Sequence, residues 1–363
     1  MLNQLRIVAT AVPVKLRYIL LLLLVIALSV RANAQPVTKV IGQGSQPQVS
    51  TSVQGVIRIV FGRNDSIFCS ASADRGTSFS VPVLVGHVPQ MHLGMARGPQ
   101  LASSARYSVI TAMDKLGDIH YFILDHQKGK WQDKGFVNDA RSSAPEGLMN
   151  IACDNQDNFY ATWLDLRVGR KNNIFFSAMA AGKGSWFKNK LVYQSPDGHV
   201  CECCRPSIAV KGANVAIMFR NWLNGSRDLY FITSKNKGQV FGDASKLGNG
   251  TWPLNACPMD GGGLTFNTDN TINTTWQRQG MVYFCKPGGN EKEIGKGRDC
   301  SIAPDKNGPI IALTSGDVIE YRNVQTNKET TVGKGAYLKT LTLPGNRILC
   351  VWEDANHIQS KIL

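Results

Sequence analysis

The residues best suited to chemistry are cysteines in the middle of the chain. Positions 201–204 read Cys-Glu-Cys-Cys, and a further cysteine stands in Asn-Ala-Cys-Pro-Met-Asp at 255–260. Thiolates are soft ligands that suit copper or zinc, and residues 86–95 add two histidines and two methionines. The predicted ligands of such a metal are Cys201, Cys203, Cys204, Cys257, His87 and His92. The other interpretation is a disulfide from Cys201 or Cys204 to Cys257, and the sequence leaves both open.

A second candidate group consists of arginines and aspartates that stand beside glycine and tryptophan in loop-like segments. The fork-shaped guanidinium group suits planar carboxylates, so several arginines around one point predict a polar pocket for an anionic ligand. The predicted substrate-binding residues are Arg97, Arg167, Arg205, Arg220, Arg227, Asp228, Asp260 and Arg278. The other interpretation is a rim of arginines and aspartates that pair with one another.

The N-terminus predicts export. Arg6, Lys15 and Arg17 precede an apolar run at 18–30, and Ala-Asn-Ala at 32–34 offers a cleavage site. The run is shorter than the ~20 residues that a membrane-spanning helix needs. We therefore expect a signal peptide at 1–34 and a secreted or periplasmic domain at 35–363 without an integral membrane segment. An uncleaved membrane anchor is the alternative.

The composition limits the class of protein. The chain has 363 residues, of which 43% are hydrophobic, and a formal net charge of +14. This apolar fraction supports a packed core and excludes a mainly disordered chain. The basic residues are dispersed along the chain, so we expect no nucleic-acid partner.

Short runs rich in β-forming residues alternate with turn clusters throughout the chain. Val-Ala-Ile-Met-Phe at 215–219 is such a run, and Lys-Gly-Ala-Asn at 211–214 is the turn before it. No long apolar pattern with helical period is present. The sequence predicts an all-β fold built from hairpins.

One short motif recurs along these strands. Residues 72–79 read Ser-Ala-Asp-Arg-Gly-Thr-Ser-Phe, and residues 234–241 read Ser-Lys-Asn-Lys-Gly-Gln-Val-Phe. Two incomplete copies of the motif, at 129–131 and 184–187, lie between them. The closing aromatic residues at 79, 131, 187 and 241 are 52, 56 and 54 residues apart. This near-constant spacing predicts a repeat architecture.

The motif resembles the Asp box of bacterial neuraminidase (BNR) repeats, which are typical of sialidase-like β-propellers. In that family the box joins the third and fourth strands of a blade, so the resemblance implies structural roles for its residues. They are Ser72, Asp74, Gly76, Phe79, Ser234, Asn236, Gly238 and Phe241. We expect seven blades, the last completed by an N-terminal strand at 37–41, with six blades as the alternative.

The resemblance implies that the face opposite the Asp boxes carries the site. Sialidases of this type bind a carboxylate with three arginines and use a tyrosine–glutamate pair and an acidic aspartate. Here the implied catalytic residues are Tyr283, Glu146 and Asp165, with Tyr321, Glu202 and Asp114 as alternatives. The implied function is an exo-sialidase-like glycoside hydrolase that acts on anionic glycans without a cofactor. The alternatives are a non-catalytic glycan- or protein-binding propeller and a copper- or zinc-binding propeller.

Overall fold

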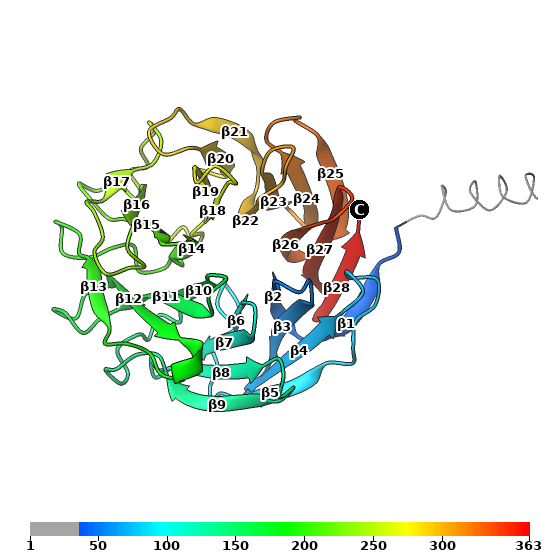
Figure 1. The fold of residues 1–363 in the computed structure, drawn as a ribbon. Coiled ribbons are helices and arrows are strands. Elements are labelled where there is room, and N and C mark those ends of the chain that lie inside the picture. The colour runs from blue at the N-terminus through cyan, green and yellow to red at the C-terminus, as the bar shows by residue number, and fades with distance from the viewer. Residues whose placement is uncertain (1–35) are drawn as a thin grey trace, which may run out of the picture. The chain divides into compact units, whose positions relative to one another are not determined.

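The computed structural model of the protein describes residues 36–363, so the predicted signal peptide lies outside the described part. Residues 38–363 form one unit, in which seven antiparallel sheets of four strands each are arranged around a central channel (Figure 1). The predicted all-β, seven-bladed propeller is confirmed. Within residues 36–363 no helix has the length and apolar character to span a bilayer.

The first four blades each use four consecutive strands, which run outward from the channel in sequence order. The first blade consists of β2 (Ser45–Thr51), β3 (Ile57–Arg63), β4 (Ser66–Ser72) and β5 (Val83–His87). The second consists of β6 (Gln100–Ser103), β7 (Tyr107–Met113), β8 (Ile119–Asp125) and β9 (Trp131–Phe136). The third consists of β10 (Met149–Cys153), β11 (Asn158–Asp165), β12 (Asn173–Ala180) and β13 (Lys190–Tyr193), with the short 3-10 helix η1 (Ala181–Lys183) before β13. The fourth consists of β14 (Ser207–Lys211), β15 (Asn214–Arg220), β16 (Leu229–Ser234) and β17 (Ser245–Lys246).

The last three blades continue this order until the ring closes. The fifth consists of β18 (Gly263–Phe266), β19 (Ile272–Arg278), β20 (Met281–Cys285) and β21 (Lys292–Lys296). The sixth consists of β22 (Arg298–Ala303), β23 (Ile310–Ser315), β24 (Val318–Asn323) and β25 (Glu329–Lys334). The seventh consists of β26 (Ala336–Leu343), β27 (Arg347–Asp354), β28 (His357–Ile362) and the N-terminal strand β1 (Lys39–Gln43). The predicted closure by an N-terminal strand is therefore confirmed, because β1 pairs antiparallel with β28.

The hydrophobic core lies between neighbouring blades. The second strand of a blade is covered on both sides, and its side chains are almost all buried, as in β11 and β15. Three tryptophans on such strands, Trp163, Trp276 and Trp352, are at most 2% exposed, and each belongs to a different core cluster. Burial of a large apolar side chain contributes ~1.5–3 kcal/mol, so these layers hold adjacent blades together.

The connections divide between the two ends of the channel. Because each blade is an antiparallel meander, its third-to-fourth-strand connections share one end, which we call the turn face. All four copies of the sequence motif are such connections, in blades one to four. The second-to-third-strand connections and the segments between blades lie at the other end, which we call the loop face.

The two complete motif copies form turns with the same hydrogen bonds. The Ser72 hydroxyl donates to Asp74 Oδ1 (2.8 Å) and accepts from the Gly76 amide (2.8 Å). The Ser234 hydroxyl likewise donates to Asn236 Oδ1 (2.7 Å) and accepts from the Gly238 amide (3.0 Å). An asparagine oxygen thus replaces the carboxylate oxygen as an acceptor. The closing aromatics, Phe79 and Phe241, pack against the core clusters beside their blades.

Gly238 and Gly76 provide a matched test of this geometry. Both have positive φ, 77° and 81°, which costs an alanine about 1–2 kcal/mol. A Cβ at Gly238 would lie 2.2 Å from the Phe176 ring, whereas the nearest atom at Gly76 is 3.4 Å away. We expect Gly238→Ala to lower the free energy of unfolding by about 2–4 kcal/mol, since overpacking adds to the strain. Gly76→Ala should cost only about 1–2 kcal/mol. Urea denaturation of both variants checks this, and equal losses would contradict it.

Candidate functional site

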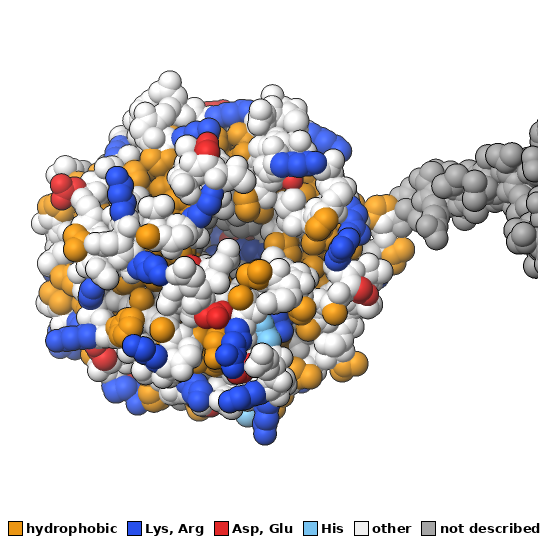
Figure 2. Space-filling model, viewed as in Figure 1, with side chains coloured by type: hydrophobic (Ala, Val, Ile, Leu, Met, Phe, Trp, Pro, Cys, Tyr) orange, Lys and Arg blue, Asp and Glu red, His pale blue; other side chains and the backbone are white. Residues whose placement is uncertain are grey.

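The predicted site residues come from the loop face, as expected from their positions in the chain. Asp165, Arg220 and Arg278 are the last residues of the second strands β11, β15 and β19. Arg205 and Asp260 lie in segments that lead from one blade to the next. Figure 2 shows a hollow at the centre of the ring with Lys and Arg side chains in its depth. The candidate site is therefore built around the channel.

A polar cavity of ≈ 200 Å³ lies in the channel. Its walls come from the inner strands β2, β10, β14, β18, β22 and β26 and from the residues just before β14 and β18, so six blades contribute. Its polar lining includes Gln48, Asn150, Arg205, Ser207, Ser301 and Lys339. An adjoining cavity of ≈ 20 Å³ is lined by Arg205, Asp260, Asp299 and Lys339, so these four charged residues form one cluster.

Arg205 is half-buried and lies immediately before β14. Its Nη1 atom donates to the Ala96 carbonyl and to Gln100 Oε1, both at 3.3 Å, which fixes the guanidinium group in the channel. Burial lowers the pKa of Arg205, whereas Asp260 and Asp299 act to raise it. An arginine stays protonated despite such a shift, so this is a permanent positive charge at the cavity.

Lys339 brings a second cation to the same cavity from β26 of the seventh blade. Burial and the nearby Arg205 lower the pKa of Lys339 to about 8, and Asp299 acts in the opposite direction. Burial and Asp260 raise the pKa of Asp299. The ion pairs found within residues 36–363 involve other side chains, so neither Arg205 nor Lys339 has a carboxylate partner there. The two cations therefore share the cluster with the carboxyl groups of Asp260 and Asp299 but form no direct ion pair with them.

A hollow of ≈ 300 Å³ lies between the fifth and sixth blades and shares Asp260 with the channel cluster. Its lining also includes Gln277, Arg298 and Thr314. Gln277 Oε1 and Thr314 Oγ1 are buried, and within residues 36–363 they have no hydrogen-bond partner. Unsatisfied buried polar atoms are uncommon, and these two belong to residues in the lining of the hollow.

Asp165 and Arg167 form an internal network. Asp165 is fully buried, and its carboxylate accepts hydrogen bonds from Trp163 Nε1, Ser143 Oγ and Arg167. Arg167 pairs in addition with Asp139. The carboxylate of Asp165 thus has protein donors on both oxygens and is closed to solvent, an arrangement suited to holding the third blade together.

Arg278 and Tyr283 form a second network, in the fifth blade. Arg278 makes a two-pronged ion pair with Glu291, with nitrogen–oxygen distances of 2.7 and 2.6 Å. Its guanidinium carbon lies 4.2 Å from the centre of the Tyr283 ring, which in turn stacks on Trp276. These contacts place both residues within the blade and away from the channel cavity.

Arg220 and Asp228 bind neighbouring backbone and side chains in the same part of the ring. Arg220 is 1% exposed and donates to the carbonyl groups of Arg227, Asp260 and Gln277, which ties the fourth blade to the fifth. Asp228 accepts from the Trp252 amide and Thr251 Oγ1 and pairs with Lys246. Arg220 therefore holds two residues of the adjoining hollow in place.

Glu146 and Arg97 meet on the loop face, but through the backbone. Arg97 Nε donates to the carbonyl oxygen of Glu146 (2.6 Å), and the Glu146 carboxylate accepts only a long hydrogen bond from Asn172 (3.4 Å). None of the three implied catalytic residues, Asp165, Tyr283 and Glu146, lines the channel cavity. The structure brings Arg205 and Asp260 together at the channel and links Arg220 to Asp260 and Arg227 through their carbonyl groups. Arg167, Asp228 and Arg278 form ion pairs elsewhere.

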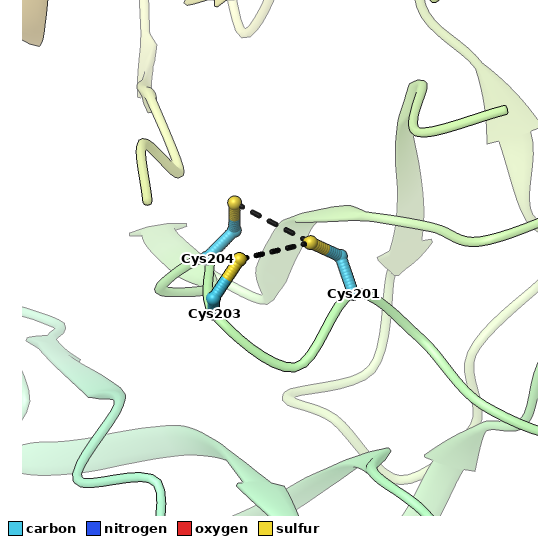
Figure 3. A group of neighbouring side chains, drawn as sticks. All are labelled: Cys201, Cys203 and Cys204. Atoms are coloured by element: carbon cyan, nitrogen blue, oxygen red, sulfur yellow. Dashed lines mark hydrogen bonds between the residues drawn. The ribbon is translucent and has the colours of Figure 1, made fainter. Parts of the chain in front are cut away.

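The cysteines of the 201–204 segment converge. Cys201 Sγ lies 3.6 Å from Cys203 Sγ and 3.5 Å from Cys204 Sγ, and all three residues are buried (Figure 3). Arg227 Nη1 donates to Cys201 Sγ (3.0 Å) and pairs with Glu202 (3.2 Å). The hydrogen-bonding contacts with the Cys203 and Cys204 thiols are the main cause that lowers the pKa of Cys201 well below its usual range.

The other predicted metal ligands lie apart from these three sulfurs. Cys257 is exposed, and its sulfur is 3.9 Å from Glu202 Oε1. His87 contacts Ser66, and His92 contacts the Pro145 carbonyl, so both histidines belong to the region of the first and second blades. Within residues 36–363 the one group of potential ligand atoms close enough to share an ion is Cys201, Cys203 and Cys204.

Sequence reasoning missed Lys339, Asp299 and Gln277. Lys339 stands in Ala-Tyr-Leu-Lys-Thr-Leu-Thr-Leu, where it alternates with apolar residues like any strand lysine facing solvent. Only the ring geometry turns that side of an inner strand toward the channel. Position along the chain could have identified such residues. Once the blades are placed, every residue on the channel side of a blade's first strand is a candidate for the site.

No protein-family model and no curated protein matches the chain. Among solved structures, the chain is similar to the BP39L lectin from Burkholderia pseudomallei (9% identity, 89% of this chain and 96% of that chain covered, TM-score 0.58). It is also similar to an ulvan lyase bound to a saccharide of GlcA and sulfated rhamnose (9%, 90% and 95%, TM-score 0.52). A microbial sialidase, Hz136, matches at 9% identity over 88% of this chain and 65% of that chain (TM-score 0.48). At these identities the matches to the lectin and the lyase show a shared propeller fold.

Proposed function

We propose that the chain is an exported glycan-binding propeller that holds the terminal, carboxylated sugar of an anionic glycan in its channel. The observation that carries this proposal is the pair of cations, Arg205 and Lys339, which line one polar cavity and form no direct ion pair with the neighbouring Asp260 and Asp299. A guanidinium group can bind both oxygens of a carboxylate, and a nearby ammonium group adds attraction.

The size of the cavity favours a single terminal sugar. At ≈ 200 Å³ it is smaller than the ~300–1,000 Å³ of pockets for drug-sized ligands. The hollow beside Asp260 is the proposed place for the next sugar, because Gln277, Arg298 and Thr314 are polar residues in its lining. The similar structures support a carbohydrate ligand, because they include a lectin and an enzyme bound to an acidic saccharide.

We propose binding without hydrolysis by the residues that the sialidase resemblance implies. Glycoside hydrolysis needs a nucleophile and an acid on either side of one sugar. Asp165 is enclosed by its own hydrogen bonds and Tyr283 is stacked within the fifth blade, so neither lies beside the proposed sugar. Membership of the sialidase-like family, with the turns at 72–79 and 234–241 as Asp boxes, is part of the same proposal.

The pH dependence of binding tests this proposal. Lys339 has a pKa of about 8, so it is mostly protonated at pH 7, and roughly a tenth remains protonated at pH 9. The groups that face it are Arg205, Asp299, Cys300 and Asp260, and burial keeps the Cys300 thiol neutral by raising its pKa. We expect the affinity for sialic or glucuronic acid to fall about tenfold between pH 7 and pH 9.

Isothermal titration calorimetry of the exported chain measures this dependence. Lys339→Met should weaken binding and flatten the pH profile, whereas Lys237→Met, on the turn face, should leave both unchanged. A neutral hexose should bind weakly at either pH, and a fluorogenic sialoside should not be turned over. Equal affinity for acidic and neutral sugars, or turnover of the sialoside, would overturn the proposed function.

A further inference from the structure

The group of Cys201, Cys203 and Cys204 has no part in the proposed glycan site, so a role for these cysteines is independent of that proposal. The three residues are 0%, 7% and 1% exposed and lie in the segment between β13 and β14. Their sulfurs face one another from a single turn of the chain (Figure 3). Lone buried cysteines usually act as small apolar side chains, but that role does not require three sulfurs at one point.

The backbone fixes the N-terminal side of this arrangement. The Cys201 amide donates to the Arg220 carbonyl (3.0 Å), and Val200 forms an isolated bridge with Asn221. These contacts attach the segment to the end of β15, so Cys201 has a set position when the turn at 202–204 returns the next two sulfurs toward it. The site is therefore preformed in the fold, which lowers the cost of binding a ligand.

The surroundings are suited to negative charge on sulfur. Arg227 is buried and donates to Cys201 Sγ at 3.0 Å, while it also pairs with Glu202. Arg220 is the second arginine close by, and its guanidinium group donates to the Arg227 carbonyl (2.9 Å). Two cations beside three thiols offset the charge that thiolate ligands bring to a metal.

We propose that Cys201, Cys203 and Cys204 bind one Cu(I) ion through three sulfur atoms. Soft thiolate and thioether ligands suit Cu(I) as well as zinc, and the thioether residue Met259 packs against the group. Structural zinc sites take four protein ligands in a tetrahedron, whereas within residues 36–363 this group offers three. Binding involves no change of oxidation state, and each thiol that coordinates the ion releases its proton to solvent.

A Cu(I) titration of the exported chain, without oxygen and against a competing Cu(I) chelator, tests this proposal. We expect one equivalent to bind and to produce thiolate-to-copper absorption in the ultraviolet. Cys201→Ser, Cys203→Ser and Cys204→Ser should each weaken binding at least tenfold. Cys257→Ser is the matched control, because this cysteine is exposed on the same face, and it should bind as the parent protein does.

X-ray absorption of the copper-loaded parent protein provides a measurement that needs no variant to fold, and it should report three sulfur neighbours. Fewer than three sulfurs, or tighter binding of Zn(II) than of Cu(I), would overturn the proposal. A disulfide between any two of the three cysteines in the protein as exported, detected by peptide mass spectrometry, would also overturn it. Sugar binding is measured in a separate experiment, so a failure of the copper proposal is distinguishable from a failure of the proposed function.

Discussion

Arg205→Ala is expected to lower the affinity of the protein for carboxylated sugars by about 10- to 100-fold. Hydrogen bonds to charged groups contribute ~1.5–3 kcal/mol, and the variant removes the permanent cation of the channel cavity. The guanidinium group is held by Ala96 and Gln100, so it is oriented before the ligand arrives and little entropy is lost on binding. Calorimetry with sialic acid at pH 7 measures the change.

Arg170→Ala is the matched control for this variant. Arg170 is an exposed arginine in the connection between β11 and β12, so it lies on the loop face but outside the cavity. The Arg170→Ala variant should bind the sugar as the parent protein does. If Arg205→Ala bound sialic acid unchanged while its thermal unfolding matched that of the parent protein, the channel would not be the ligand site.

Asp165→Ala should lower the free energy of unfolding by about 3–5 kcal/mol, because it removes one partner of a buried ion pair. The variant also leaves Trp163 Nε1 and Ser143 Oγ without the acceptor that they share in the parent protein. Chemical denaturation measures the loss. A large loss distinguishes a structural role from a catalytic one, since a catalytic acid can be removed at little cost in stability.

Asp139→Ala gives the comparison for Asp165. Both carboxylates pair with Arg167, but the Asp139 side chain is 41% exposed and that of Asp165 is 0% exposed. Exposed ion pairs contribute ~0–1 kcal/mol, so this variant should lose far less stability. An Asp165→Ala protein with the stability of the parent would contradict the structural assignment.

The fold was predictable because its signal is repetitive. The motif spacing placed one turn in each of the first four blades, and the number of short apolar strands placed the remaining blades. The closing strand β1 was predictable for a different reason. Residues 336–363 contain only three strands, and the free edge of the last one needs a partner strand for its backbone hydrogen bonds.

The site was less predictable because residue type does not fix the direction of a side chain. Arg205, Arg278 and Arg167 look equivalent in the sequence, yet the latter two find carboxylates within their blades. Tyr283 lies on a third strand, where its ring stacks on Trp276. Lys339 reaches the channel only because the ring brings β26 opposite Arg205. The Cys-Glu-Cys-Cys segment was apparent from its composition, but its separation from both histidines depends on which blades are neighbours.

A crystal structure of the protein with sialic acid is the most direct test of the central claim. We predict the sugar in the channel, with its carboxylate against Arg205 and Lys339. The contrary result would place the sugar on the turn face, in the ≈ 180 Å³ groove that Tyr160, Phe187, Lys190 and Gly238 line between the third and fourth blades. Density there and an empty channel would contradict the assignment of the loop face as the functional face.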